Sequence, residues 1–286
     1  MAIEVKNLTY TYSANTPFEK RAITDISFSI KEGETVGIIG STGSGKSTLI
    51  QHLNGLIRAE SGSIKVYDID LTAKKPNFKR LRSMVGMLFQ YPEYQLFEDT
   101  VLKDVSFAPR NFGYNAEQAA RAAREAIELV GLDYEIVKDK SPFELSGGEK
   151  RRVAIAGVIA YRPKILILDE PTAGLDPAGK KEILSLIQHL KSGGIRTVIA
   201  ISHNMDEIAE YTERVLVLNE GRLVADKTPK ELFADKNAFA NTGLALPHTA
   251  NIANLIREKG ADIPNTPLTT EELCKDIVAY LGGDNG

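Results

Sequence analysis

A glycine-rich segment of the sequence, GSTGSGKST, runs from Gly40 to Thr48. It follows an apolar run, Thr35–Ile39, and precedes a helical pattern that begins near Lys46. Glycine permits a tight turn whose backbone N–H groups, together with the N-terminus of the following helix, hold phosphate oxygens. We expect Lys46 to reach the β and γ phosphates of a nucleoside triphosphate and the hydroxyl of Ser47 to bind Mg²⁺. The predicted nucleotide contacts are Gly40, Ser41, Thr42, Gly43, Ser44, Gly45, Lys46, Ser47 and Thr48.

Two acidic residues follow another apolar run. The segment ILILDE predicts a strand over Ile165–Leu168 that delivers Asp169 and Glu170 to the edge of a sheet, where ligands bind in α/β proteins. Neighbouring residues on a strand point to opposite faces. Asp169 is therefore expected to join the Mg²⁺ shell through water, while Glu170 faces the γ phosphate as general base for an attacking water.

A histidine follows the next apolar run. His203 comes after Thr197–Ile201 and is expected to reach the γ phosphate with an imidazole N–H. A lone histidine is more often structural, but the position at a strand end outweighs that expectation here. The other histidines lack this position and are predicted to be structural: His52, His189 and His248.

The segment LSGGE opens a further predicted helix. Ser146 and Glu149 have the spacing of a capping box, and two glycines, Gly147 and Gly148, lie between them. A free helix N-terminus with its N–H groups and the Ser146 hydroxyl suits a γ phosphate. Taken alone, the motif is equally compatible with a simple helix cap.

These motifs lie on a predicted α/β framework. Four continuous apolar runs predict the central strands: Thr35–Ile39, Met84–Phe89, Ile165–Leu168 and Thr197–Ile201. Alternating apolar residues predict earlier, half-buried strands at Ile26, Phe28 and Ile30 and at Ile64 and Val66. The segment between the second and third runs is mostly helical, with one apolar face over Ala116–Val130, so we expect an inserted helical subdomain at about residues 91–162.

The pattern changes after about residue 235. Two short helices are predicted, separated by a turn over Pro264–Pro267, and the second begins with a capping box formed by Thr269 and Glu272. Such a C-terminal extension is either a module that binds a partner or a lid on the core of the same chain.

Composition excludes several classes of protein. The chain has 286 residues, 43% of them hydrophobic and 26% charged, which is typical of a soluble globular protein. A net charge of −3 and a pI near 5.9 do not support nucleic-acid binding, and the basic cluster at residues 74–82 is predicted to be a solvated face. The single cysteine, Cys274, fits a reducing compartment, and no apolar run is long enough to cross a bilayer. We expect a cytoplasmic chain.

In the order and spacing of these motifs, the chain resembles the nucleotide-binding subunits of ABC transporters over nearly its whole length. Carried over position by position, the resemblance assigns Gly40–Ser47 to the Walker A loop, Gln90 to the Q-loop, Leu145–Glu149 to the signature, Asp169 and Glu170 to Walker B and the catalytic glutamate, Ala173–Asp176 to the D-loop and His203 to the switch histidine. It implies catalytic roles for Lys46, Gln90, Glu170 and His203, metal contacts from Ser47, Gln90 and Asp169, and adenine stacking on Tyr12, with Tyr10 the weaker choice.

The resemblance also implies a fold and a mode of assembly. The fold is a P-loop NTPase with a RecA-like core, covering residues 1–235, and N-terminal antiparallel strands, followed by the extension at 236–286. The cofactors are ATP and Mg²⁺. Two such domains pair head to tail, so that Walker A of one subunit and the signature of the other, including Ser146, Gly147, Gly148 and Glu149, enclose each ATP.

A narrower resemblance rests on FQYPEYQLFEDTVLKDV, from Phe89, and SPFELSGGEKRRVAIAGVIA, from Ser141. Both segments are similar to those of energy-coupling factor (ECF) ATPases, and the second-ATPase subtype fits best. That family implies uptake of vitamins or trace metal ions at the cytoplasmic face of the cell membrane. Its implied partners are a second ATPase, related or identical, a transmembrane coupling protein and a small membrane substrate-binding protein, with the extension helping the ATPases to pair.

Four residues after Gln90 form an expected docking surface for a membrane partner's helix: Glu93, Gln95, Leu96 and Phe97. Local packing of the inserted subdomain is the alternative interpretation of these residues.

The sequence departs from the ABC family at one signature position, where Glu149 replaces the usual glutamine. We expect its charge to slow turnover modestly, with Lys150, Arg151 and Arg152 compensating for repulsion of a triphosphate.

Two other functions are compatible with the sequence. One is the ATPase of another class of ABC importer. The other is a soluble ABC ATPase that acts on nucleic acid or ribosomes, against which stand the single ATPase unit, the acidic pI and the lack of a long coiled-coil insertion.

Overall fold

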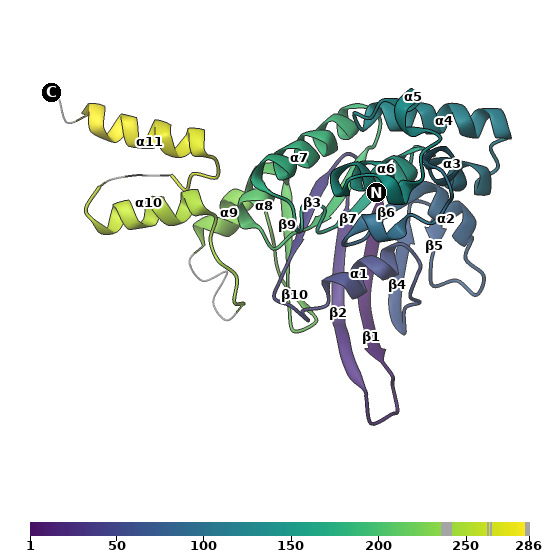
Figure 1. The fold of residues 1–286 in the computed structure, drawn as a ribbon. Coiled ribbons are helices and arrows are strands. Elements are labelled where there is room, and N and C mark those ends of the chain that lie inside the picture. Colours follow the sequence, from purple (N-terminus) through teal and green to yellow (C-terminus); the bar gives the residue numbers. More distant parts are fainter. Residues whose placement is uncertain (236–241, 262, 264, 284–286) are drawn as a thin grey trace.

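The computed structural model describes residues 1–235, 242–261, 263 and 265–283, and its centre is a six-stranded sheet (Figure 1). Its strands lie in the order β10 (Arg222–Lys227), β9 (Arg214–Asn219), β3 (Thr35–Ile39), β8 (Thr197–Ile201), β7 (Ile165–Asp169) and β6 (Val85–Leu88). All pairs are parallel except β9 with β10. The four predicted central strands are confirmed, although β6 is shorter than predicted because Met84 ends helix α2 (Phe78–Met84).

A second sheet is antiparallel and built mainly from the N-terminal part of the chain. Its strands lie in the order β2 (Lys20–Ile30), β1 (Ile3–Tyr12), β4 (Ser61–Val66) and β5 (Ile69–Asp70). Val5 pairs with Phe28 on one side and Ile64 on the other, which confirms the predicted half-buried strands. Apolar side chains of both sheets and of helix α1 (Lys46–Leu53) pack into one core, so the loop before α1 is held between two rigid layers.

Helical sequence fills the connection between β6 and β7. Its elements are η1 (Pro92–Gln95), α3 (Val101–Asn111), α4 (Ala116–Leu129), α5 (Tyr134–Val137), η2 (Pro142–Glu144) and α6 (Gly147–Ile159). Helix α4 ends one residue earlier than predicted, with Val130 as its C-cap, and buries Ala119, Ala123 and Ile127 as expected. Helices α3, α4 and α6 share a second core with α7 (Pro177–Ser192).

The remaining helices follow the last parallel strands. Helix α8 (Met205–Tyr211) connects β8 to β9, and α9 (Pro229–Ala234) follows β10. The two predicted C-terminal helices are confirmed as α10 (His248–Glu258) and α11 (Thr270–Gly283), while Pro264 of the predicted turn lies outside the described residues. In the part of the chain that the structure describes, no helix is long and apolar enough to span a bilayer.

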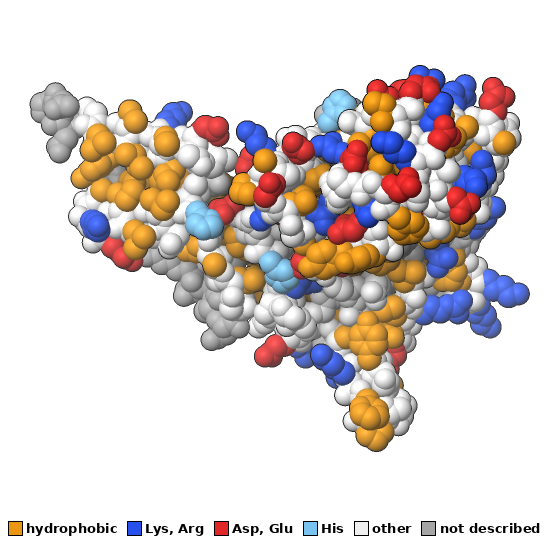
Figure 2. Space-filling model, viewed as in Figure 1, with side chains coloured by type: hydrophobic (Ala, Val, Ile, Leu, Met, Phe, Trp, Pro, Cys, Tyr) orange, Lys and Arg blue, Asp and Glu red, His pale blue; other side chains and the backbone are white. Residues whose placement is uncertain are grey.

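Helices α10 and α11 form a small core of their own. Leu273 is buried together with Ala253 and Ile263, and Ile256 and Ile277 pack against them. Other apolar side chains of the two helices are exposed: Ile252, Leu255, Val278, Tyr280 and Leu281. Figure 2 shows hydrophobic side chains gathered over these helices, which lie to one side of the sheets in Figure 1. The extension therefore keeps an apolar surface that its own core does not cover.

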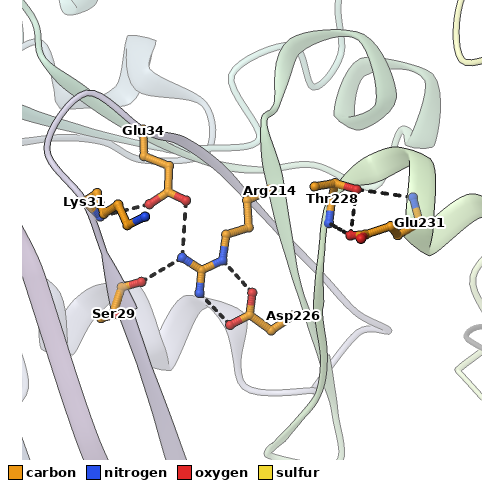
Figure 3. A network of polar contacts seen from close by, with 7 residues as sticks. All are labelled: Ser29, Lys31, Glu34, Arg214, Asp226, Thr228 and Glu231. Carbon is orange, nitrogen blue, oxygen red and sulfur yellow. Dashed lines mark hydrogen bonds and ion pairs between the residues drawn. The ribbon is translucent and has the colours of Figure 1, made fainter.

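One arginine ties the edge of the central sheet to the antiparallel sheet (Figure 3). Arg214 on β9 donates two hydrogen bonds to Asp226 on β10, at 2.5 and 2.6 Å. Its Nη1 also donates to the backbone oxygen of Ser29 on β2, at 2.9 Å, and to Glu34, at 3.2 Å. The hydrogen bonds to Asp226 raise the pKa of Arg214, so the guanidinium stays charged.

Arg214→Met is expected to lower the free energy of unfolding by about 2 kcal/mol, because it leaves two partly buried carboxylates without their donor. Urea unfolding measures this. The matched control is Arg196→Met, whose pair with Glu32 is exposed and screened by solvent, so that its loss should change the free energy of unfolding far less. Equal losses of unfolding free energy in the two variants would show that Arg214 stabilises the fold no more than a surface ion pair does.

Candidate functional site

The glycine-rich loop connects β3 to α1 and leaves the first backbone N–H groups of the helix without a side-chain cap. Gly45 is the N-cap residue and has φ +105°. A Cβ at this position would lie 2.6 Å from the backbone oxygen of Ala22, so only glycine fits. An uncapped helix N-terminus that faces a glycine loop has free N–H groups of the kind that hold phosphate oxygens.

Lys46 lies inside this loop. It is 6% exposed, and its Nζ donates to the backbone oxygens of Gly40, at 2.7 Å, and Ser41, at 2.9 Å. Burial lowers the pKa of Lys46, and the carboxylates of Glu170 and Asp169 oppose that shift. The ammonium group therefore faces both the loop carbonyls and the acidic end of β7.

A cleft of about 170 Å³ opens beside the loop. Its lining residues are Tyr12, Lys20, Ala22, Gly43, Gly45, Lys46, Ser47 and Thr48. The hydroxyl of Tyr12 lies 3.2 Å from Oγ1 of Thr48. Tyr10 instead packs edge-on against Tyr12 and His52, behind the cleft. Of the two tyrosines, Tyr12 is therefore the one that a bound base can reach.

The end of β7 brings three predicted site residues together. Glu170 accepts a hydrogen bond from Nε2 of Gln90, at 3.0 Å, through one oxygen and meets Nε2 of His203, at 2.7 Å, through the other. The backbone N–H of Glu170 donates to Ile201 on β8, at 3.0 Å. Gln90, Glu170 and His203 follow three neighbouring strands, β6, β7 and β8. Their contacts therefore hold the Glu170 carboxylate at the carboxyl ends of these strands.

The reason predicted for separating Asp169 from Glu170 was wrong. Strand β7 ends at Asp169, and Glu170 has a left-handed backbone with φ +51°. Alternation along a strand therefore does not set the direction of the Glu170 side chain, because the backbone turns after Asp169. A left-handed backbone is uncommon for a glutamate.

The pKa of Asp169 is raised to about 6, chiefly by burial and also by the nearby carboxylate of Glu170, whereas Lys46 and His203 act to lower it. A site with two carboxylates, one of them partly desolvated, favours binding of a cation. The protein oxygens available are hard ligands of the kind that Mg²⁺ prefers. Within the described residues no cluster of three or more His, Cys, Asp or Glu side chains could hold a metal. The residues present thus fit a cation whose remaining ligands are phosphate and water.

The predicted capping box at the start of α6 is confirmed. Ser146 donates from its backbone N and its hydroxyl to Oε2 of Glu149, at 2.8 and 2.7 Å, and its Oγ accepts from the Glu149 N–H, at 3.3 Å. The Ser146 hydrogen bonds lower the pKa of Glu149, so this carboxylate is charged at neutral pH. Gly147 and Gly148 are exposed.

The signature and the phosphate loop do not meet within one chain. As far as the structure is described, the lining of the loop cleft includes no residue from 145 to 149. The exposed N-terminus of α6 therefore lies outside this cleft.

Two of the three side chains predicted to compensate for the charge of Glu149, Arg151 and Arg152, make contacts within their own chain. Arg151 is 3% exposed, and both terminal nitrogens donate to the backbone oxygen of Ala173, at 3.0 Å, while Nη2 lies 3.4 Å from Glu93. Arg152 donates to the backbone oxygen of Val130 and to Glu182. Arg151 thus joins the signature helix to the segment after Glu170 and to η1, a connection without a local sequence signal.

Comparison with known proteins agrees with this geometry. A sequence model described as ABC transporter matches residues 23–173. The energy-coupling factor transporter ATP-binding protein EcfA2 of Clostridium tetani is 48% identical over 278 residues, covering 97% of this chain and 96% of the relative. EcfA2 of Caldanaerobacter subterraneus is 50% identical and covers 99% of each chain.

Solved structures lead to the same family. The structure of cbiO1 from Clostridium perfringens, part of the ABC transporter complex cbiONQ, has a TM-score of 0.73 and 39% identity, covering 90% of this chain and 98% of the other. The dimeric cassette MJ0796, bound to ADP and Pi, has a TM-score of 0.70 and 28% identity, covering 79% and 98%.

The parallel sheet, the phosphate loop and the acidic end of β7 define a P-loop ATPase of the ABC type. Within that class, the chain belongs to the ATP-binding subunits of energy-coupling factor transporters, with the EcfA2 proteins as full-length relatives.

Proposed function

We propose that this ATPase energises uptake of a vitamin or a trace metal ion, as one of two paired ATPases at the cytoplasmic face of the membrane. The full-length similarity to EcfA2 proteins carries the transport part of the proposal, and the cluster of Glu170, His203 and Gln90 beside an uncapped phosphate loop supports ATP hydrolysis. Residues 1–235 form the ATPase domain with its helical insertion at 91–162, and residues 236–286 form the extension.

The site residues take the following roles in hydrolysis. The loop from Gly40 to Thr48 and the N-terminus of α1 hold the phosphates, and Tyr12 stacks on the base. Glu170 accepts the proton of the attacking water, and His203 donates to the γ phosphate. Lys46 balances the charge that develops on the phosphoryl oxygens. Mg²⁺ supplies further neutralisation when it is held by Ser47, Asp169 and Gln90.

A second subunit completes the site. Its signature residues Ser146, Gly147, Gly148 and Glu149 present backbone N–H groups to the triphosphate, so ATP draws the pair together and hydrolysis releases it. Gln90 contacts Glu170 and directly precedes the turn that leads into η1. A change at the γ phosphate can therefore move Gln90 and, with it, η1.

The extension supports pairing better than it supports a lid. Helices α10 and α11 have their own core, and their remaining apolar side chains face outward, away from that core. The N-terminus of α10 is fixed to α8 by a hydrogen bond from the His248 N–H to Asp206, at 2.7 Å. The exposed face therefore has a fixed attachment and suits the same extension of a second ATPase.

Exposed aromatic residues near η1 form the proposed membrane-partner surface. Phe97 is 57% exposed and its ring centroid lies 4.8 Å from that of Phe107, while Tyr91 and Tyr94 are exposed and their ring centroids lie 6.2 Å apart. Leu96, predicted to belong to this surface, is buried in the helical core. Local packing thus accounts for Leu96, and the proposed docking surface keeps the exposed Phe97 and gains Tyr91 and Tyr94, which were not predicted.

Affinity purification of the full chain from its native cells in mild detergent tests the function. Recovery of a second ATPase with a transmembrane coupling protein and a small membrane protein is the expected result. The small membrane protein then defines the substrate. Recovery of membrane subunits without a substrate-binding protein would place the chain in another importer class. Recovery of ribosomes or nucleic acid instead of membrane subunits would contradict the transport function but not ATP hydrolysis.

Glu149→Gln is expected to hydrolyse ATP roughly twofold faster in the assembled complex, because it removes a charged, partly exposed group next to the partner's triphosphate. Steady-state phosphate release measures this. The matched control is Glu144→Gln, which alters a similar capping box at η2 outside the signature. Clearly slower turnover in Glu149→Gln alone would show that the carboxylate assists hydrolysis.

A further inference from the structure

A buried carboxylate lies behind the catalytic cluster and has no part in the mechanism above. Glu207 on α8 is 8% exposed. Its two oxygens accept hydrogen bonds from the hydroxyl of Thr172, both at 2.9 Å, from the hydroxyl of Ser202, at 2.9 Å, and from Nδ2 of Asn204, at 3.2 Å. A buried charge is costly, and a neutral side chain of the same shape avoids that cost. The position therefore calls for an explanation beyond packing.

The partners of Glu207 come from the two loops that carry the reacting groups. Thr172 lies two residues after Glu170, in the segment that follows β7. Ser202 and Asn204 lie on either side of His203, in the loop that follows β8. One carboxylate is thus bonded to both loops, and the same two loops bring Glu170 and His203 within 2.7 Å of each other.

We infer that Glu207 is a positioning residue for hydrolysis, which holds the Glu170 loop and the His203 loop in the register that lets these two side chains meet. The inference rests on the proposed roles of Glu170 and His203. Glu207 touches neither nucleotide nor water in this mechanism and acts through the two loops. Its bonds are charge-assisted, which makes them stronger than bonds to a neutral amide.

The donors around Glu207 explain why glutamine is a poor substitute. All three neighbouring groups donate to the carboxylate, and Oγ of Ser202 also accepts from the Asn204 N–H, at 3.0 Å. An amide nitrogen in place of Oε1 would face Nδ2 of Asn204, another donor. An amide nitrogen in place of Oε2 would require the hydroxyls of Thr172 and Ser202 to reorient. Either arrangement loosens one loop relative to the other.

The test compares Glu207→Gln and Thr172→Val in the full chain, assembled with the subunits that copurify in mild detergent. Turnover is measured against ATP concentration, and active sites are counted by binding of a fluorescent ATP analogue. We expect kcat per nucleotide-binding site to fall about tenfold in Glu207→Gln, with KM changed less than about twofold, because small displacements of reacting groups reduce the chemical step. Thr172→Val is expected to show part of this loss, and Thr172→Ser, which keeps the hydroxyl, to recover most of it.

The matched control is Glu210→Gln, an exposed carboxylate on the same helix, which should leave kcat and KM unchanged. A merely structural Glu207 would lower the melting temperature or the number of sites while kcat per site stays normal, and that result would overturn the inference. If Glu207→Gln does not fold, the comparison of Thr172→Val with Thr172→Ser decides by the same criterion. Glu170→Gln, assayed in parallel, separates the two proposals: near-normal turnover there would refute the role of Glu170 itself.

Discussion

Glu170→Gln is expected to bind ATP with near-normal affinity and to hydrolyse it roughly a hundredfold more slowly or worse, the range for loss of a general base. The geometry of the site should survive the change. A glutamine oxygen can still accept from Nε2 of Gln90, so Gln90 keeps its own oxygen for Mg²⁺, and the new amide nitrogen can donate to Nε2 of a neutral His203. The variant therefore lacks basicity and little else, and ATP should accumulate in a closed pair of subunits.

Size-exclusion chromatography with and without ATP and Mg²⁺ detects this closed pair, and phosphate release measures turnover. Glu210→Gln, with its exposed carboxylate, provides the control and should behave as the unaltered chain in both assays. A Glu170→Gln protein that turns over ATP at a near-normal rate would assign the general base to another group. A protein that fails to bind ATP would show that Glu170 holds the nucleotide.

The framework of the fold could be predicted because its signals are local. Four apolar runs gave the central strands, and capping residues such as Ser146 and Asn115 start their helices where their side chains satisfy free N–H groups. The phosphate loop is likewise one continuous segment, so its geometry follows from the positions of its glycines.

The connections between segments could not be predicted in this way. Arg151 contacts Glu93, 58 residues away in the sequence, and Ala173, 22 residues away. The spacing of apolar residues carries no information about contacts between such distant positions. The left-handed backbone of Glu170 is also imposed by its surroundings, because its N–H is bonded to Ile201 on β8. Only Glu207 left a trace in the sequence, as a charged residue among Met205, Ile208 and Ala209 on the buried face of a short helix.

Lys46→Ala is expected to lose tight binding of Mg²⁺–ATP and to reduce turnover by roughly a hundredfold or more, because a buried ammonium provides strong, preorganised stabilisation of phosphate charge. Two effects combine in this variant. The backbone oxygens of Gly40 and Ser41 lose their shared donor, so the loop loosens. The pKa of Asp169, already raised to about 6, also rises further because Lys46 lowers it in the unaltered chain.

The second effect gives the variant a pH signature. A carboxyl group binds a cation in its ionised form, and raising its pKa leaves less of that form at neutral pH. Affinity for Mg²⁺–ATP should therefore fall more steeply in Lys46→Ala than in the unaltered chain as the pH is lowered from 8 toward 6.5. Titration with a fluorescent ATP analogue at several pH values measures both the loss and its slope.

Two variants separate charge from packing at this position. Lys46→Met fills the buried space without a charge, so it should bind Mg²⁺–ATP as poorly as Lys46→Ala while unfolding at a higher denaturant concentration. Lys181→Ala removes an exposed lysine on α7 and should change neither property. Retention of tight binding by Lys46→Met would mean that the loop needs the lysine stem and not its charge, and the phosphate contact would then fall to the backbone N–H groups at the start of α1.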